Sequence, residues 1–385
     1  MYGIYLHFPF CISKCHYCDF YSITELSPID NFVNALCKEI QLQDSISRIH
    51  KPKVDTIFLG GGTPSLLKPS QLEIIIETLY KYFDIAQNTE FTIECNPGTL
   101  TETSLKEFRG LGINRLSIGV QSFNQDELKF LQRIHTTDDA VKSIEIARKS
   151  GFENISIDLI FSIPGQTLES WNNTLEKTIS MELEHISAYS LIYEKDTPLY
   201  NDWLNHKVEK TDEETEAKYY ETLIEKLVNH GLEHYEVSNF AKPNKKCRHN
   251  LKYWQGEEYF AFGPSANGYL NNTRYWNVKN LKLYFDSINQ NKLPIEGSEH
   301  ISRETKIIER AFLELRAEGI RIQKFKDDFQ FDILTELKEY IRDYEKEGFI
   351  KLSEDKIKLT TKGYLLCEEI SVQIMSAIEK RLKFK

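Results

Sequence analysis

A chain of 385 residues, of which 41% are hydrophobic and 12% aromatic, can bury a large core, so we expect two or three domains or one barrel with an appendage. A net charge of −10 at pH 7 gives no general attraction to nucleic acid, and no apolar run reaches the roughly 18 residues that a membrane helix needs. Seven cysteines, an odd number, without a secretion signal at the amino terminus indicate reduced thiols and a cytoplasmic protein.

Apolar and β-branched runs alternate with helical periodicity through the first half of the chain. The expected strands are Tyr2 to Phe10, Val54 to Leu59, Phe91 to Cys95, Arg115 to Val120, Ile155 to Ile160 and Ile186 to Ile192. Helical stretches separate them. This alternation predicts parallel βαβ units, arranged either in an open doubly wound sheet or in an incomplete TIM-like barrel.

Polar residues at the ends of the strands favour the barrel. They follow five successive strands: the cysteine loop after Phe10, Gly60 to Thr63, Glu94 to Asn96, Gln121 and Asp158. In a barrel, reactive groups gather at the carboxyl ends of several different strands. We therefore expect an α/β fold with a partial TIM-like (β/α)6 barrel and one central site.

Three domains are expected. Residues 1–230 form the barrel with its cysteine loop, and residues 231–300, dense in aromatic residues, Asn and Gly, form a loop-rich segment that covers it. Residues 301–385 show helices followed by a short hairpin, as in a winged helix. The charge of this last region is near neutral, so a docking or lid module is favoured over a DNA-binding one.

Cys11, Cys15 and Cys18 lie within eight residues of one another, directly after the first strand. Cysteines at i, i+4 and i+7 can place three thiolates around one iron–sulfur cube and leave the fourth iron open. The alternative is a zinc site of three Cys and one His, with His16 as the fourth ligand. The remaining cysteines are single and scattered, which favours the open cluster over zinc.

The other strand-end residues suit a polar ligand. Gly60 to Thr63 allow the backbone to approach a ligand closely and to expose unpaired N–H and C=O groups, although a tight βα turn explains them equally well. Glu94, Gln121 and Asp158 can hydrogen-bond hydroxyl and amino groups, and Arg133 can meet a carboxylate in bidentate fashion. Each of these residues could instead satisfy loop backbone, so the functional interpretation depends on their convergence.

A series of motifs carries a family resemblance. They are Tyr5-x-His7-x-Pro9-x-Cys11-x3-Cys15-x2-Cys18, Gly60-Gly61-Gly62-Thr63-Pro64, Glu94-x-Asn96-Pro97, Gly119-Val120-Gln121-Ser122, Arg133-x-His135, and Asp158-Leu159-Ile160 through Pro164-Gly165-Gln166-Thr167. In order and spacing the chain resembles the radical S-adenosylmethionine superfamily, and within it the HemN/HemW branch.

The resemblance implies a set of cofactor contacts. Cys11, Cys15 and Cys18 would hold a [4Fe-4S] cluster, whose open iron S-adenosylmethionine chelates. Residues matching contacts to that S-adenosylmethionine are Tyr5, Gly61, Gly62, Thr63 and Glu94, and residues matching contacts to a second molecule are Gln121, Arg133 and Asp158. The sequence assigns no catalytic residue.

A second motif, Cys247-Arg248-His249-Asn250-Leu251-Lys252-Tyr253-Trp254, resembles the His-Asn-x-x-Tyr-Trp motif of the heme chaperones in this branch. An imidazole is a common axial ligand of heme iron, and Tyr253 and Trp254 offer flat surfaces for a macrocycle. His249 is the expected ligand, with the Cys247 thiolate as the alternative. The alternative interpretation is structural: the histidine would form hydrogen bonds within a loop, and its aromatic neighbours would only pack against the barrel.

The resemblance implies a heme chaperone that hands heme to an unidentified acceptor protein, for which a respiratory protein is one candidate. The alternative is an oxygen-independent coproporphyrinogen III oxidase that decarboxylates propionate side chains. Phe20 stands where that enzyme has a further cysteine, and only four residues precede Tyr5, which counts against the alternative. A nucleic-acid-binding regulator is disfavoured by the charge, and no membrane insertion is expected.

Overall fold

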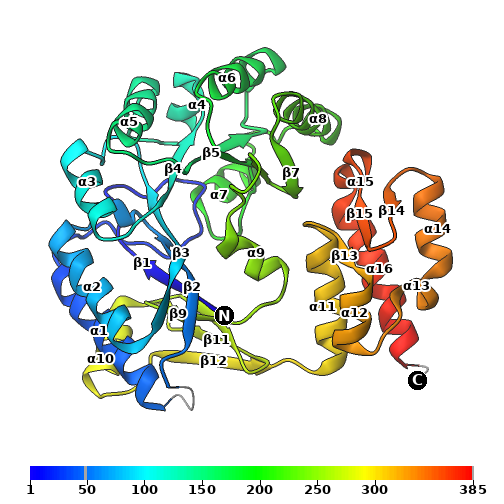
Figure 1. The fold of residues 1–385 in the computed structure, drawn as a ribbon. Helices are drawn as coiled ribbons and strands as arrows, with labels where there is room; N and C mark the ends of the chain where they lie inside the picture. The colour runs from blue at the N-terminus through cyan, green and yellow to red at the C-terminus, as the bar shows by residue number, and fades with distance from the viewer. Residues whose placement is uncertain (47–49, 384–385) are drawn as a thin grey trace. The chain divides into compact units, whose positions relative to one another are not determined.

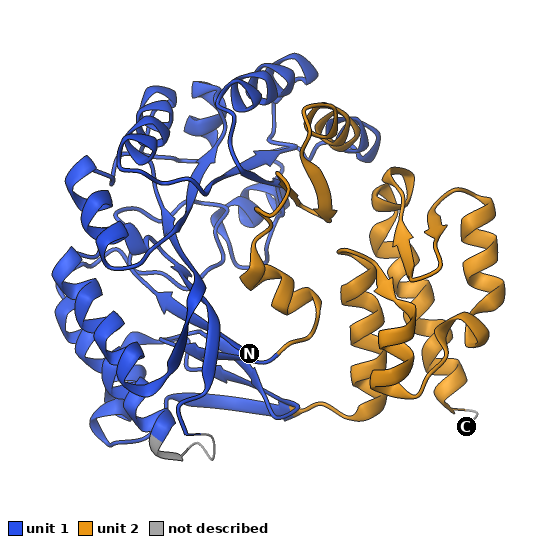
Figure 2. Cartoon of the chain, in the orientation of Figure 1, with its two compact units in different colours: residues 1–219, 258–299 blue, residues 220–257, 300–385 orange. Residues whose placement is uncertain are grey.

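The computed structural model describes residues 1–46 and 50–383, which form two compact units. Unit 1 contains residues 1–219 and 258–299, and unit 2 contains residues 220–257 and 300–385, so each unit is assembled from two separate stretches of the chain (Figure 2). Each unit is described by itself below.

Unit 1 is built on a parallel sheet. Its first six strands lie side by side in chain order: β1 (Tyr2–Phe8), β2 (Lys53–Gly61), β3 (Asp84–Cys95), β4 (Arg115–Gln121), β5 (Ile155–Phe161) and β6 (His185–Ser190). Almost every residue of β5 is buried, as is typical of a parallel strand covered on both faces. The expected partial (β/α)6 barrel is confirmed.

Helices connect these strands and cover the outer side of the curved sheet (Figure 1). They are α1 (Ile29–Ile46), the short η1 (Pro64–Leu66), α2 (Pro69–Tyr82), α3 (Glu102–Gly110), α4 (Gln125–Phe130), α5 (Thr137–Lys149) and α6 (Leu168–Ser180), followed after β6 by α7 (Pro198–Leu204) and α8 (Glu213–Asn229). Thr101, Thr136 and Thr167 each accept a hydrogen bond from a backbone N–H of the first helical turn, which begins α3, α5 and α6 at these residues.

The segment 231–300, expected to be one loop-rich stretch, contains helices and strands in both units. In unit 1, β9 (Tyr259–Phe262) pairs in parallel with β1, and β10 (Asn267–Leu270), β11 (Thr273–Asn277) and β12 (Ile295–His300) extend the sheet beyond it, with α10 (Leu281–Asn289) between the last two. Three of the four residues of β9 are buried in succession, so they show none of the alternation by which a half-buried strand is recognised.

Unit 2 begins within α8, whose residues from 220 onward belong to it, and continues with a hairpin and one helix: β7 (Glu233–Glu236), β8 (Asn239–Ala241) and α9 (Arg248–Trp254). After residue 300 it continues with α11 (Arg303–Leu315), β13 (Ile320–Arg321), α12 (Ile322–Phe329), α13 (Ile333–Glu336), α14 (Lys338–Lys346), β14 (Ile350–Leu352), β15 (Lys356–Leu359), α15 (Thr361–Leu365) and α16 (Cys367–Lys383). The predicted order of helices and then a hairpin is confirmed, and β13 joins that hairpin to make a three-stranded sheet.

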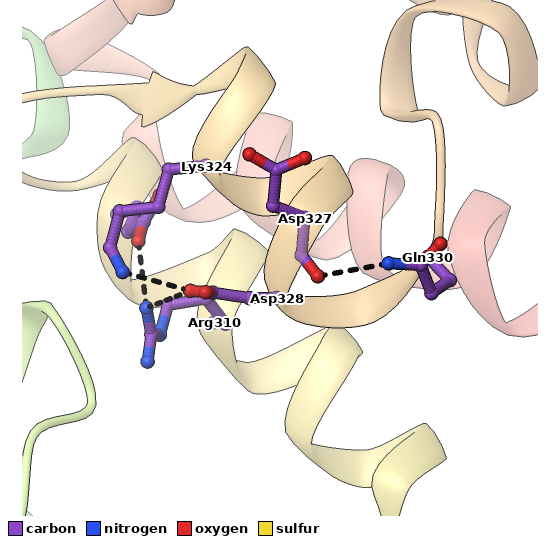
Figure 3. A network of polar contacts seen from close by, with 6 residues as sticks. Arg310, Lys324, Asp327, Asp328 and Gln330 are labelled. Carbon is purple, nitrogen blue, oxygen red and sulfur yellow. Dashed lines mark hydrogen bonds and ion pairs between the residues drawn. The ribbon is translucent and has the colours of Figure 1, made fainter.

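The core of unit 2 lies between α11, the sheet and α16, and includes Ile307, Phe325, Ile357 and Ile374. A partly buried polar network joins α11 to α12 (Figure 3). Arg310 Nη1 lies 3.1 Å from Glu314 Oε1 and 3.7 Å from Asp328 Oδ2, and Lys324 Nζ lies 3.0 Å from the same oxygen of Asp328. Among the described residues, no helix is long and apolar enough to cross a membrane.

Candidate functional site

The cysteine loop follows β1 and is held by backbone hydrogen bonds at both ends. The Cys11 N–H donates to the Ile23 carbonyl at 2.9 Å, the Ile23 N–H donates to the Pro9 carbonyl at 2.7 Å, and the Cys18 N–H donates to the Cys15 carbonyl at 3.2 Å. All three thiols are free and half-buried. The loop therefore presents three cysteines from a fixed backbone at the carboxyl end of the first barrel strand.

Two of the three sulfurs accept hydrogen bonds from neighbouring strand ends. Thr63 Oγ1 donates to Cys11 Sγ at 3.6 Å, and Arg133 Nη1 donates to Cys15 Sγ at 3.5 Å. Asn96 connects the two donors, because its Nδ2 donates to Thr63 Oγ1 at 2.9 Å and its Oδ1 accepts from Arg133 Nη2 at 2.7 Å. Donors of this kind stabilise negative charge on sulfur, so this arrangement fits a group that is held by thiolates.

The alternative zinc site required His16 to join the cysteines. The His16 ring is buried, and it packs edge-on against Phe130 with ring centroids 5.3 Å apart. Among the residues that the structure describes, no group of three or more His, Cys, Asp or Glu side chains, the three cysteines included, is gathered as for a single metal ion, so this finding does not separate the zinc site from the open cluster. The packing of His16 against Phe130 is the observation that disfavours His16 as a fourth ligand.

The glycine motif serves the packing of the cysteine loop. The Gly62 N–H donates to the Phe8 carbonyl at 2.7 Å, the Thr63 N–H donates to the Phe10 carbonyl at 2.8 Å, and the Gly61 N–H donates to Glu94 Oε2 at 3.0 Å. A Cβ on Gly62 would lie 2.6 Å from the Phe10 carbonyl oxygen, so only glycine permits this close approach. The prediction of unpaired N–H groups is wrong for these three residues, because Glu94, Phe8 and Phe10 already accept from them.

Glu94 and Asp158 are half-buried residues that place carboxyl groups, largely removed from water, at the strand ends. Burial, and then the neighbouring Asp158, raise the pKa of Glu94 to about 8. Burial also raises the pKa of Asp158, although hydrogen bonds from Ser187 and Ser117 oppose the rise. Ser117 Oγ donates to Asp158 Oδ1 at 3.2 Å. The two carboxyl groups therefore share a low-polarity part of the barrel and bind a proton more tightly than usual.

Tyr5 lies in the middle of β1, and Gln121 is the last residue of β4. The Tyr5 hydroxyl donates to His7 Nδ1 at 3.0 Å, because His7 Nε2 donates to the Tyr21 carbonyl at 2.9 Å, and burial lowers the pKa of His7 to about 4. Gln121 has a φ of 68°, which is uncommon for a residue with a side chain. A Cβ on Gly119 would lie 2.8 Å from Gln121 Nε2, so the glycine makes room for this amide.

Three residues near the carboxyl groups were missed by the sequence analysis: Arg115, Ser117 and Ser187. Arg115 is buried, and its charge opposes the rise in the pKa of Glu94 and of Asp158. Ser117 lies opposite Glu94 in the pairing of β4 with β3, and Ser187 lies opposite Asp158 in the pairing of β6 with β5. The signal was present in part, because Arg115, Ser117 and Gln121 alternate along one face of β4.

The residues of the second motif lie in unit 2, on α9. His249 is buried, and its Nε2 lies 2.8 Å from the Tyr253 hydroxyl, with the two rings edge to face. Trp254 lines a small cavity with Glu314 and Gly319 instead. The structure therefore brings His249 and Tyr253 together at i and i+4 of one helix, whereas Trp254 points to a different part of the unit.

Cys247, the alternative ligand, is also buried and immediately precedes α9. Its N–H donates to the Tyr235 hydroxyl at 3.2 Å. Unit 1 thus holds the cysteine loop and its strand-end residues, and unit 2 holds the residues of the second motif.

Comparison with known proteins gives two family matches and several relatives. The Radical SAM superfamily matches residues 5–178, and the HemN C-terminal domain matches residues 301–366. "Heme chaperone HemW" of Bacillus subtilis is 38% identical over 373 residues, which cover 96% of this chain and 98% of that protein. The protein of the same name from Lactococcus lactis is 36% identical over 94% of each chain.

A solved structure, coproporphyrinogen III oxidase (HemN) from Escherichia coli, has the same fold. It superposes with a TM-score of 0.83 over 97% of this chain and 89% of that one, at 22% sequence identity. At this identity the likeness establishes the fold alone. The relatives that match nearly end to end show that the chain belongs to the HemW family, in the HemN/HemW branch of the radical S-adenosylmethionine superfamily.

Proposed function

We propose that this protein is a heme chaperone, which binds heme and transfers it to an acceptor protein. The observation that carries the proposal is the likeness to the Bacillus subtilis heme chaperone, at 38% identity over 98% of that protein. Relatives with the same name from Lactococcus lactis and Mycobacterium tuberculosis, at 36% and 30% identity, also match over more than nine-tenths of their length.

The heme ligand in this proposal is the His249 imidazole. A hydroxyl at 2.8 Å from Nε2 fixes the orientation of the ring, and helix α9 places both side chains on one face. Because His249 is fully buried, side chains around it have to rearrange before the imidazole can reach iron. Tyr253 then has two roles, since it holds the free imidazole and offers an aromatic surface to the macrocycle.

Membership of the superfamily implies a [4Fe-4S] cluster and S-adenosylmethionine, and we propose unit 1 as their site. Cys11, Cys15 and Cys18 would hold the cluster, and Thr63 and Arg133 would stabilise its sulfur ligands through the contacts described above. The residues proposed to line the S-adenosylmethionine pocket are Tyr5, Gly61, Gly62, Thr63, Glu94, Gln121, Arg133 and Asp158. When bound, such a cluster supplies one-electron chemistry.

Porphyrinogen decarboxylation is not favoured. The fold likeness to the Escherichia coli oxidase is at 22% identity and does not carry an activity to this chain. Phe20, at the position of that enzyme's further cysteine, is 61% exposed and cannot act as a thiol ligand. The acceptor protein, the cytoplasmic location and the absence of nucleic-acid binding stay predictions.

Hemin titration of the full chain, followed by its Soret absorption, tests the proposal. We expect His249→Ala to weaken hemin binding by about tenfold or more, because a direct bond to iron is lost. Tyr253→Phe removes one hydrogen bond to the imidazole and should cost about 0.5 to 1.5 kcal/mol. The matched control is His230→Ala, which removes an exposed histidine of the same unit.

Two outcomes would contradict the proposal. Unchanged affinity and spectrum in His249→Ala would remove this residue from the site, and Cys247→Ser would then show whether the thiolate takes its place. Repeated turnover of coproporphyrinogen III, assayed anaerobically with S-adenosylmethionine and a reductant, would favour the oxidase instead.

A further inference from the structure

We propose that the basic face of the three-stranded sheet in unit 2 is a carboxylate-binding site, and that the carboxylates it takes are the two propionates of heme. The basic face consists of Arg321 on β13, Lys351 on β14, and Lys356 and Lys358 on β15. The identity of the ligand depends on the heme-chaperone function proposed above, whereas the carboxylate site itself depends on the contacts described next.

The pairing of the strands puts four cations on one side of the sheet. Lys356 lies opposite Arg321, and Lys358 lies opposite Lys351. The alternate residues Ile320, Ile350, Ile357 and Leu359 belong to the buried core of the unit, so the cations occupy the other face. Like charges directly opposite one another destabilise a sheet. Two such pairs on adjacent strands are therefore unfavourable unless nearby carboxylates or a bound anion offset their repulsion.

A cavity of 630 Å³ opens on part of this face. Lys356 and Lys358 line it from the sheet, and residues 231–235 line it from the start of the β7–β8 hairpin. The volume falls within the range of about 300–1,000 Å³ that is usual for sites of small molecules and cofactors. Its wall includes apolar or aromatic side chains, namely Val228, Leu232 and Tyr235, which suit a ligand with an extended apolar body.

The charges that line the cavity are unbalanced. Lys246 is already paired with two carboxylates, Glu233 at 2.7 Å and Glu318 at 3.0 Å. Within the described part of the chain, neither Lys356 nor Lys358 takes part in an ion pair with those carboxylates or with others. Three ammonium groups against two carboxylates leave an excess positive charge in the cavity.

The electrostatics of Lys358 agree with this arrangement. Burial, and then the charge of Lys246, lower the pKa of Lys358, and the nearby carboxylates of Glu318 and Glu233 oppose this shift without cancelling it. His234, also in the wall, contributes no charge at neutral pH, because burial lowers its pKa to about 4. The ligand that best fits this balance carries one or two negative charges.

The ligand chemistry is that of an amphiphilic carboxylate. Lys356 and Lys358 are two residues apart on one strand, so their Cα atoms are separated by about 7 Å, and each can meet one carboxylate of a ligand with two. The small excess of positive charge left after Glu233 and Glu318 pair with Lys246 suits one or two carboxylates better than the continuous charge of a nucleic acid. A small dicarboxylate with an apolar body, such as heme, satisfies both the cations and the apolar wall.

The cavity is also connected to the start of α9. Tyr235 lines the cavity, and its hydroxyl accepts a hydrogen bond from the N–H of Cys247, the residue that precedes the helix bearing His249. Lys246, which is paired in the cavity, is the next residue before Cys247. Occupation of the cavity would therefore act on the segment that leads into the proposed heme-ligating helix.

The test compares hemin with hemin dimethyl ester, which lacks free carboxylates, on the full chain. We expect the wild-type protein to prefer hemin, and the double variant Lys356→Gln with Lys358→Gln to lose this preference, with hemin binding weaker by about fivefold for each lysine. The matched control is Lys338→Gln with Lys346→Gln, which removes two exposed lysines of the same unit and the same total charge. The control should keep the preference.

Each outcome decides a separate question. If the Lys356→Gln, Lys358→Gln protein kept the full preference for hemin over its ester, the carboxylate site would be wrong while the heme-chaperone function stood. If no protein bound hemin, the proposed function would fail. In that case the carboxylate site is tested separately by calorimetric titration with succinate. Succinate binding that is lost in the Lys356→Gln, Lys358→Gln protein would support a site for a free dicarboxylate, and binding that is unchanged or absent would contradict it. Binding of a single-stranded oligonucleotide through the same two lysines would overturn the inference.

Discussion

At the scale of single residues, the ionisation of Glu94 is set by its surroundings. Its carboxyl group lies at the end of β3 and accepts from the Gly61 N–H at 3.0 Å, and burial followed by the neighbouring Asp158 raises its pKa to about 8. In the unfolded chain the pKa of a glutamate is about 4.3. At a pH between these two pKa values, the Glu94 carboxyl keeps its proton in the folded protein and loses it in the unfolded chain.

The stability contributed by Glu94 is therefore present below about pH 4.5 and is lost as the pH rises toward 8. Glu94→Gln keeps an oxygen for the Gly61 N–H and cannot ionise. We expect the free energy of unfolding of Glu94→Gln, relative to the wild type, to increase steadily between pH 5 and pH 8, as measured by chemical denaturation. Glu107→Gln, which changes an exposed glutamate, should show no such trend. A flat difference for Glu94→Gln would mean that this carboxyl ionises as usual.

At the scale of elements, one buried carboxylate joins α1 to the strands and helix that follow β9. Glu39 on α1 accepts hydrogen bonds from Tyr284 Oη on α10 at 2.7 Å, from Asn277 Nδ2 on β11 at 2.6 Å and from the Gly263 N–H at 2.8 Å. Burial raises the pKa of Glu39 to about 7 although all three partners donate to it. Glu39 thus connects α1 to the segment from β9 to α10 through polar contacts that no local sequence pattern predicts.

Removal of one of these donors should weaken the whole connection. We expect Tyr284→Phe to lower the free energy of unfolding by about 1 to 3 kcal/mol, because a buried carboxylate loses a partner and no water replaces it. Urea denaturation measures the loss. Tyr80→Phe serves as the control, since Tyr80 is 56% exposed. Equal effects of the two substitutions would show that the hydroxyl of Tyr284 contributes nothing through Glu39.

At the scale of the whole molecule, unit 2 is assembled from two stretches that are far apart in sequence. The Val237 N–H donates to the Arg316 carbonyl at 2.9 Å, and Lys246 pairs with Glu318. His234 packs between Phe240, with ring centroids 4.5 Å apart, and Tyr364, at 4.3 Å. The matched HemN C-terminal domain, residues 301–366, is therefore only part of a larger unit whose hairpin comes from before residue 258.

His234→Ala tests this assembly. Loss of two ring contacts should destabilise unit 2 by about 1 to 3 kcal/mol. Native-state hydrogen exchange should show faster exchange in β15 and α15 while the strands of unit 1 stay unchanged. If hydrogen exchange also became faster throughout unit 1, the prediction that the effect of His234→Ala is confined to unit 2 would be wrong.

The effect of His234 should also depend on pH. Because burial lowers the pKa of His234 to about 4, its stabilising effect is complete above about pH 6.5 and is lost as the pH falls toward 4. The difference in the free energy of unfolding between variant and wild type should therefore shrink over this range.

The sequence by itself determined the features that local patterns encode. The strands from Tyr2 to Ile192 and the helices between them follow from periodicity, and the order of helices and hairpin after residue 301 does so as well. Cys11, Cys15 and Cys18 fall on one loop because the spacing is itself local. His249 and Tyr253 meet because residues four apart share a helix face.

Only the tertiary structure decided the features that depend on partners distant in the chain. The N–H groups of Gly61, Gly62 and Thr63 donate to Glu94, Phe8 and Phe10, respectively. Ser117 and Ser187 donate to Asp158, and the charge of Arg115 acts on both Glu94 and Asp158. Strand β9 is recognised by its pairing with β1, some 250 residues earlier, and not by alternation. Unit 2 combines residues 220–257 with residues 300–385, and β9 to β12 lie between these two stretches in the sequence. The partner of a buried polar group and the polarity around a buried charge depend on residues of neighbouring strands. These residues are distant in the sequence, so local patterns do not predict them.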